Sequence, residues 1–211
     1  MTESEWLTCT DPDPMLAYLR TRASSRKLRL FACACARRGW DLLTDERSRR
    51  AVEVAERYAD GEADKIELAN VSATAWEAWR NAAEAAACDV VNPNSWTAAM
   101  DAAKHASWAT KNYRADELTI LASLLRDLFN PFLFRPMNLN APVLKWNDNT
   151  VVRLARSMYD DTRFEEVPIL GDALEEAGCQ DADILGHCRN PGPHVRGCWL
   201  VDLLLEKRQL R

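Results

Sequence analysis

The sequence predicts an all-α protein, a multi-helix bundle with a smaller helical unit at its C-terminal end. Apolar residues recur three and four positions apart along most of the chain, which is the spacing of one helix face. Only 7 of the 211 residues are Gly, whereas sandwiches and barrels depend on Gly-rich turns. Hydrophobic residues make up 47% of the chain, enough for a folded core.

The first part of the chain is predicted to form three helices, over residues 13–22, 26–43 and 44–60. Ser24 or Ser25 is placed to cap the second helix, because a Ser side chain accepts a hydrogen bond from the first free backbone N–H groups. Thr44 is placed to begin the third. Gly61 follows it and favours the left-handed backbone that ends helices.

The next part is predicted to form three more helices, over residues 63–91, 95–112 and 115–129. The sequence NPNS at 92–95 separates the first two, with Asn94 or Ser95 as the cap. The third has a regular apolar face, made of Leu118, Leu121, Leu125 and Leu128.

Residues 130–148 (NPFLFRPMNLNAPVLKWND) contain three Pro and no helical periodicity. We expect a long connection that lies on the surface, and connections of this length often have a function or join domains. Aromatic and Arg side chains dominate protein interfaces. The predicted interaction surface therefore consists of Phe132, Phe134, Trp146 and Arg196.

The C-terminal part is predicted to form four helices, over residues 149–160, 168–177, 181–189 and 194–207, and Gly178 ends the second. We expect a helical bundle at 1–130, a Pro-rich connection at 131–148 and a C-terminal helical unit at 149–211. All three would pack as one globular domain.

The stretch GHCRNPGPHVRGCW at 186–199 concentrates Cys and His residues. A turn at Asn190-Pro191-Gly192 would fold two helices back on each other, and His194 and Cys198 would share one face of the second. Zinc is bound by four N or S ligands in a tetrahedron. The zinc interpretation uses the following residues: Cys188, His194 and Cys198, with His187 or Cys179 as the fourth ligand.

Two other interpretations of this stretch stay open. Cys packs readily as a small buried hydrophobic residue, so the cluster can be ordinary core. Alternatively, Cys188 or Cys198 is a nucleophile with His194 or His187 as its base. No third orienting group can be identified, and we assign no catalytic residue.

Basic residues are concentrated between positions 20 and 50, although the whole chain carries a net charge of −5. Such clustering is typical of phosphate-binding faces, and the candidate anion or nucleic-acid face is Arg26, Lys27, Arg37 and Arg38. These residues could equally pair with acids of the same chain or form a solvated surface. The sequence favours a protein partner over nucleic acid.

The start MTESEWLTCT is not a signal peptide, and no apolar run approaches the ~20 residues of a membrane span. We expect a soluble, cytoplasmic protein that does not bind a membrane, whose seven Cys stay free thiols. The leading interpretation is a non-enzymatic helical interaction module without a cofactor. The alternatives are a zinc-stabilised domain, a Cys–His enzyme and a nucleic-acid binder.

Several phrases carry a family resemblance, among them KLRLFACACARRGWDLLTDERSRRAVEVAERYADG, TVVRLARSMYDD and GHCRNPGPHVRGCWLVDLLL. The chain resembles a paralogous family of planctomycete-type bacterial proteins over nearly its whole length. Its stretch LGDALEEAGCQDADILGHCR is also similar to a short repeat-companion module of the same genomes. The resemblance implies a recurrent C-terminal signature and an interaction or regulatory role, and it implies no activity or cofactor.

Overall fold

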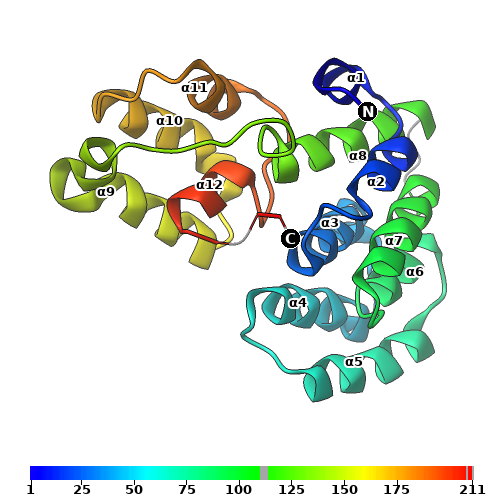
Figure 1. Cartoon of the computed structure of the whole chain (residues 1–211). Helices are drawn as coiled ribbons and strands as arrows, with labels where there is room; N and C mark the ends of the chain where they lie inside the picture. The colour runs from blue at the N-terminus through cyan, green and yellow to red at the C-terminus, as the bar shows by residue number, and fades with distance from the viewer. Residues whose placement is uncertain (110–113, 208, 211) are drawn as a thin grey trace. The chain divides into compact units, whose positions relative to one another are not determined.

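The computed structural model describes residues 1–109, 114–207 and 209–210, and the chain divides into two compact units (Figure 1). Unit 1 comprises Met1–Leu125 with Leu210–Arg211, and unit 2 comprises Arg126–Gln209. The predicted all-α class is confirmed: the described residues form twelve α-helices and two short 3-10 helices. Their β-type pairing is a single isolated bridge between Ala23 and Leu210.

Unit 1 contains the following helices: α1 (Glu3–Thr8), α2 (Pro12–Leu19), α3 (Ser25–Arg38), α4 (Glu46–Asp60), α5 (Lys65–Ala78), α6 (Ala82–Asp89), α7 (Ser95–Ala109) and most of α8 (Arg114–Phe129), with η1 (Trp40–Leu42) after α3. Ser24 caps α3 by accepting from the Lys27 N–H, and Gly61 ends α4 with φ +80°, both as predicted. Asp45 caps α4 in place of the predicted Thr44 start.

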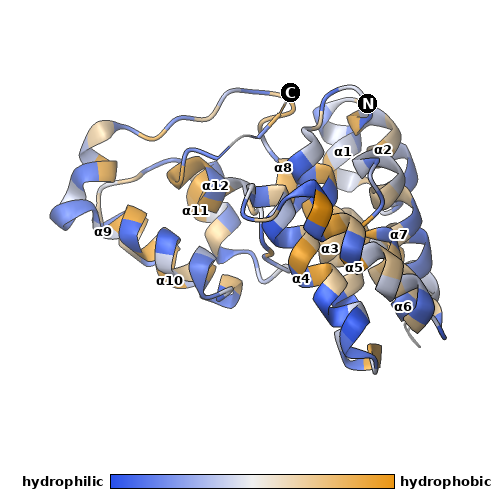
Figure 2. Ribbon diagram, turned by 90° about the horizontal axis from the view of Figure 1, so that it is seen from below, coloured by the Kyte–Doolittle hydropathy of each residue, from blue (hydrophilic) through white to orange (hydrophobic). Residues whose placement is uncertain are grey.

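The centre of unit 1 is α3, which packs against α4, α6 and α7 and is buried on every side from Lys27 to Ala36 (Figure 1). Figure 2 shows its strongly hydrophobic ribbon. The end of α3 can approach α6 closely because the residues at their contact, Gly39 and Ala83, are small. A Cβ added to Gly39, at the end of α3, would lie 2.9 Å from the Cβ of Ala83.

The prediction of one helix over 63–91 is wrong, because the chain breaks between α5 and α6. Asn81 caps α6 by accepting from the Glu84 N–H. The buried Glu84 carboxylate in turn accepts from the backbone N–H of Arg80, 2.6 Å away. This local bonding outweighs the helix propensity of the surrounding Ala residues. The predicted residues 110–112 of the following helix lie outside the described residues.

Unit 2 contains the end of α8 and the following helices: α9 (Ala141–Asp160), α10 (Val167–Glu176), α11 (Ala182–Arg189) and α12 (Trp199–Leu204), with η2 (Phe164–Glu166) before α10. Helix α9 packs against α10 and α12, and α10 packs against α11. Gly178 follows α10 with φ +86°, as the sequence predicts for its end.

The predicted connection at 131–148 is partly helical, because α9 begins at Ala141. Asn140 caps it by accepting from the Val143 N–H, and Pro142 fits the first turn, where no backbone donor is needed. Three consecutive residues, Asn147 to Asn149, then take left-handed φ values of 44°, 57° and 58°. They divide α9 into a short first part and a longer second part.

The predicted helix over 194–207 is wrong, because α12 begins only at Trp199. Gly197 takes φ +92°, which interrupts a right-handed helix, and the Cys198 N–H closes a turn onto the Val195 carbonyl at 2.8 Å. Residues 194–197 are therefore a loop with an irregular backbone. Across the described residues, no helix has the length and apolar character needed to cross a bilayer.

Candidate metal centre

Asp127, in the last turn of α8, supplies a carboxylate that is 4% exposed. Its Oδ2 accepts from the Val195 N–H at 3.0 Å, and its Oδ1 lies 2.7 Å from His194 Nδ1. A buried carboxylate is costly unless it is paired and hydrogen-bonded. Asp127 therefore fixes the loop before α12 to the end of α8.

His187, near the end of α11, has a ring that is 12% exposed and makes contacts at both nitrogens. Its Nε2 lies 3.1 Å from Cys198 Sγ and 3.5 Å from Asp127 Oδ1. Its Nδ1 accepts from the indole N–H of Trp199 at 3.0 Å. An indole nitrogen only donates, so the neutral His187 ring carries its proton on Nε2.

His194 and Cys198 stand on the loop between α11 and α12. The Asn190 side chain accepts from the Gly192 N–H at 3.1 Å and starts the turn, and His194 Nε2 lies 3.3 Å from the Asn190 carbonyl oxygen. Cys198 is fully buried. The two His194 nitrogens therefore both face oxygen atoms, Nδ1 that of the Asp127 carboxylate and Nε2 that of the Asn190 carbonyl.

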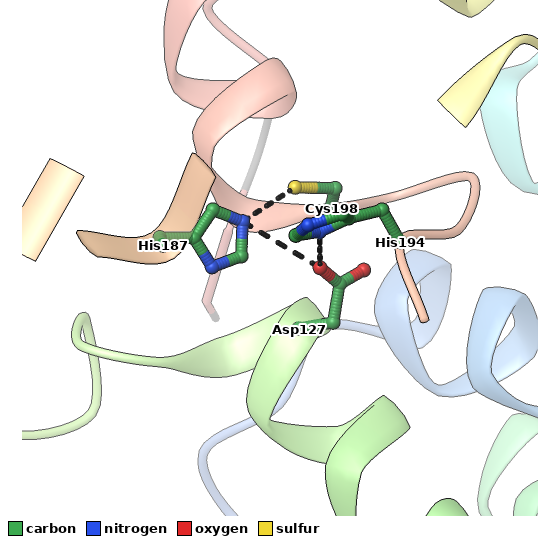
Figure 3. Close-up of side chains that lie close together, drawn as sticks. All are labelled: Asp127, His187, His194 and Cys198. Atoms are coloured by element: carbon green, nitrogen blue, oxygen red, sulfur yellow. Dashed lines mark hydrogen bonds and ion pairs between the residues drawn. The ribbon is translucent and has the colours of Figure 1, made fainter. Parts of the chain in front are cut away.

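One ligand atom from each of four residues gathers within 4.8 Å of all the others: Asp127, His187, His194 and Cys198. Figure 3 shows them converging from the end of α8, from α11 and from the loop before α12. Ligands at about 2.0–2.3 Å from a zinc ion lie roughly 3.3–3.8 Å from one another in a tetrahedron. The contacts of 3.1 and 3.5 Å are close to that spacing, and the 2.7 Å contact between Asp127 and His194 is shorter. Small side-chain shifts would therefore be needed to place an ion among these atoms.

The structure brings together three of the five residues that the zinc interpretation names, His187, His194 and Cys198. Cys188 and Cys179 lie outside the group. Cys188 faces α10, where a Cβ added to Gly171 would lie 2.6 Å from the Cys188 Cβ. Burial, and then the nearby Cys179, raise the pKa of the Cys188 thiol to about 12, so it stays protonated at neutral pH.

Sequence reasoning missed Asp127. It stands in the apolar run LLRDLF next to the buried Leu128 and Phe129. An acid that the helical period places between core residues is a signal for a buried partner, and reading it that way would have found this ligand.

The predicted interaction residues contribute mostly to the packing of unit 2. Phe132 and Trp146 are partly buried against its core, and the Phe132 ring meets the Trp199 ring edge to face at 5.9 Å. The Arg196 guanidinium lies 4.5 Å from the centre of the Tyr159 ring and donates to the Tyr159 carbonyl at 3.0 Å. Phe134 is partly exposed.

The predicted anion face is largely used within unit 1. Arg26 pairs with Asp60 at 2.9 Å, and Lys27 is fully buried. Two further ion pairs complete the set: Arg37 with Glu56 and Arg38 with Glu117. Pairing with acids of the same chain therefore accounts for Arg26, Arg37 and Arg38.

Comparisons with protein-family models, with curated proteins and with solved structures found no match for this chain. The chemistry of the site therefore has to be argued from its geometry. In a Cys–His–Asp catalytic arrangement, one ring nitrogen faces the thiol and the other faces the carboxylate. Here one nitrogen of His187, Nε2, faces both Cys198 and Asp127, and the thiol is buried, so the geometry is closer to a closed metal site.

Proposed function

We propose that unit 2 is a metal-stabilised helical domain that binds one zinc ion through Asp127, His187, His194 and Cys198. The observation that carries the proposal is the gathering of four ligand atoms within 4.8 Å. One comes from the end of α8, and the other three come from α11 and the loop that follows it, far along the chain from Asp127. Two imidazoles, one thiolate and one carboxylate are the donor types that zinc accepts.

Charge and burial support a structural role for the ion. A thiolate on Cys198 and a carboxylate on Asp127 would balance the two charges of zinc and leave a neutral buried centre. The side chains of Asp127 and His194 are 4% and 7% exposed, and Cys198 is fully buried. Structural zinc sites are closed in this way, whereas catalytic sites keep an open position for water or substrate.

Binding would also require a local change at Trp199. A metal ion on His187 Nε2 moves the ring proton to Nδ1, which now faces the indole N–H of Trp199. Two donors cannot share a hydrogen bond, so the indole has to shift when the ion binds. Trp199 is therefore the expected reporter of metal loading.

The decisive experiment measures zinc and stability together on the full chain. We expect about one zinc per chain after purification under mild conditions, and a lower melting temperature after chelation. A ligand that is present at about 1,000 times its Kd stabilises a fold by about 4 kcal/mol. Loading with cobalt should produce a thiolate-to-metal charge-transfer band that is absent in Cys198→Ser.

The third His of the chain provides a matched control. His105 lies in unit 1 and pairs with Asp89 at 2.6 Å, outside the cluster. His194→Gln should lose the zinc, whereas His105→Gln should keep it. The proposal fails if the wild-type chain stays metal-free in added zinc, or if His194→Gln and Cys198→Ser retain as much zinc as the wild type.

We also propose that this domain is a protein-interaction module of a cytoplasmic protein. All seven cysteines are free, and six of them are buried, which supports a reducing compartment. The same resemblance to planctomycete-type paralogues supports an interaction role. Crosslinking in living cells, followed by identification of the attached proteins, tests this part; recovery of the chain without any attached protein would contradict it.

A further inference from the structure

Unit 2 has a hollow of about 680 Å³ beside α9 and the end of α12. Part of its lining is apolar, from Leu139, Leu144, Val152 and Leu203. These four side chains are only partly buried, although they pack against the core of the unit. The hollow therefore leaves apolar surface in contact with solvent.

The charged part of the lining is mostly cationic. Lys145, Arg153 and Arg156 contribute positive charge, and Glu206 contributes one negative charge. Arg153 pairs with Asp148 at 3.5 Å and contacts Thr150 at 3.3 Å, and its side chain is 65% exposed. We call this hollow, with its apolar floor and its three cations, the cationic groove. Its chemistry suits an acidic segment with an apolar side chain at its centre.

Helix α10 presents such a segment on the same chain. Its inner face, with Val167, Leu170 and Leu174, is buried in the core of unit 2. Its outer face places Ile169 beside Asp172, and Ile169 is 54% exposed. Among the described residues of unit 2, Ile169 is the one large hydrophobic residue with this exposure.

Acids lie on the same side of α10 as Ile169. Asp172 and Glu176 follow it by three and seven positions, and Glu165 lies just before α10, in η2; all three are exposed. Within the described part of the chain they form no salt bridge, unlike Glu166 with Arg163 and Glu175 with Arg189. We call Ile169, Asp172 and Glu176 the acidic face of α10.

We propose that the cationic groove of one molecule binds the acidic face of α10 of a second copy. The inner face of α10 holds the helix in its own core, so its outer face cannot turn into the groove of the same molecule. The contact joins two different surfaces, so it is heterologous and adds molecules head to tail. It does not depend on the metal site proposed above.

The test is the mass of the zinc-supplemented full chain in solution, followed by light scattering from about 1 µM to about 1 mM. We expect the average mass to rise with concentration and to fall again in about 1 M salt, where charges are screened beyond about 3 Å. A wild-type chain that stays monomeric over the whole range overturns the proposal. The same result is expected if the groove binds an acidic segment of another protein and not a second copy, and it overturns the proposal in that case too.

Two charge-reversed variants identify the surfaces. Arg153→Glu with Arg156→Glu changes the groove, and Asp172→Lys with Glu176→Lys changes the helix. Each variant alone should be monomeric, because like charges then face each other in its own contact. An equimolar mixture should associate again, since each variant supplies the complement of the other.

The chain with all four substitutions should also regain association. All four positions are exposed, so unchanged helical content and melting temperature verify the fold of each variant. Association that persists in both variants alone, or that fails to return in the mixture, overturns the assignment of these surfaces. Zinc content measured on the same samples separates this result from the metal proposal.

Discussion

The buried carboxylates of the two units have different partner side chains. In unit 1, Arg37 meets Glu56 at 2.7 Å, and Arg38 meets Glu117 through two contacts of 3.1 Å. In unit 2, Asp127 meets two imidazoles, with a thiol beside them. Guanidinium groups keep their charge at every relevant pH and bind no metal, whereas imidazole and thiol groups titrate and ligate.

This difference separates an ion pair whose contribution is independent of metal from a site whose contribution depends on metal binding. A carboxylate held by Arg stabilises its unit in the same way at all metal concentrations. A carboxylate that is paired with His and Cys belongs to a site whose imidazole and thiol groups can release protons when a metal ion binds. Asp89 of unit 1 stands between these cases, because it meets a single imidazole, that of His105.

The largest expected effect comes from removing one carboxylate from each unit. Glu117→Gln leaves the Arg38 charge facing a neutral amide, and loss of one partner of a buried pair costs about 3–5 kcal/mol. Arg38 is 30% exposed, so we expect the lower end of that range. Urea denaturation with and without a chelator should give the same loss in both conditions.

Asp127→Asn is the counterpart in unit 2. We expect its cost to be larger in added zinc than in chelator, because the wild type alone gains stability from the ion. If the two costs were equal, or if the cost of Glu117→Gln depended on chelator, the contrast between the units would disappear.

A smaller effect is expected from two Gly residues at close helix contacts. Gly39→Ala would bring a Cβ to 2.9 Å from Ala83 in unit 1, and Gly171→Ala would bring one to 2.6 Å from Cys188 in unit 2. Such overpacking costs about 1–3 kcal/mol. Only Gly171→Ala should also weaken zinc binding, because Cys188 stands next to His187 on α11.

A second substitution tests the cause of the Gly171→Ala effect. The clash joins two Cβ atoms, so Cys188→Ala in the Gly171→Ala background should restore neither melting temperature nor zinc binding. Recovery would show that the sulfur atom, and not the approach of the two helices, limits the contact.

The parts of the fold that the sequence predicts correctly rest on local signals. Ser24, Gly61 and Gly178 act at helix ends through their own side chains or backbone freedom, and each lies where the structure ends or begins a helix. The start of α12 was not predictable in this way. The Val195 N–H is held by Asp127, which is 68 positions away in sequence.

The same distinction applies to the candidate site. The composition of the C-terminal stretch singles out His187, His194 and Cys198, but it cannot say which of two adjacent residues faces the cluster. That choice depends on Gly171, where a side chain is absent and α11 can bring Cys188 against α10. Asp127 is invisible to a search for Cys and His, because its role follows from tertiary burial.

A further test concerns the indole of Trp199. Trp199→Phe removes the N–H that faces His187 Nδ1 and keeps an aromatic ring in the core. We expect zinc to bind up to about tenfold tighter, since one net hydrogen bond is worth about 0.5–1.5 kcal/mol and no longer opposes the metal-bound tautomer. Competition with a chromophoric chelator measures this; weaker binding in the variant would show that the indole supports the loaded site.

The last expected effect concerns Asp89 and appears only as a dependence on pH. Burial raises the pKa of the Asp89 carboxyl from 3.8 to about 6, and the hydrogen bond to His105 opposes this rise. Between about pH 4 and pH 6 the folded chain therefore holds a proton that the unfolded chain has released. The stabilisation from the protonated Asp89 carboxyl is fully present below its unfolded pKa of 3.8 and is lost as the pH rises through its folded pKa of about 6.

Asp89→Asn cannot titrate, so the stability of the wild type relative to this variant should fall as the pH rises from 4 to 7. The change should not exceed about 3 kcal/mol, because each pKa unit between 3.8 and about 6 corresponds to about 1.36 kcal/mol and solvent screening lowers the total. Denaturation of both chains in chelator removes the metal contribution of unit 2 from the comparison. A difference that stays constant over this range would show that the Asp89 carboxyl titrates in the folded chain as it does in the unfolded one.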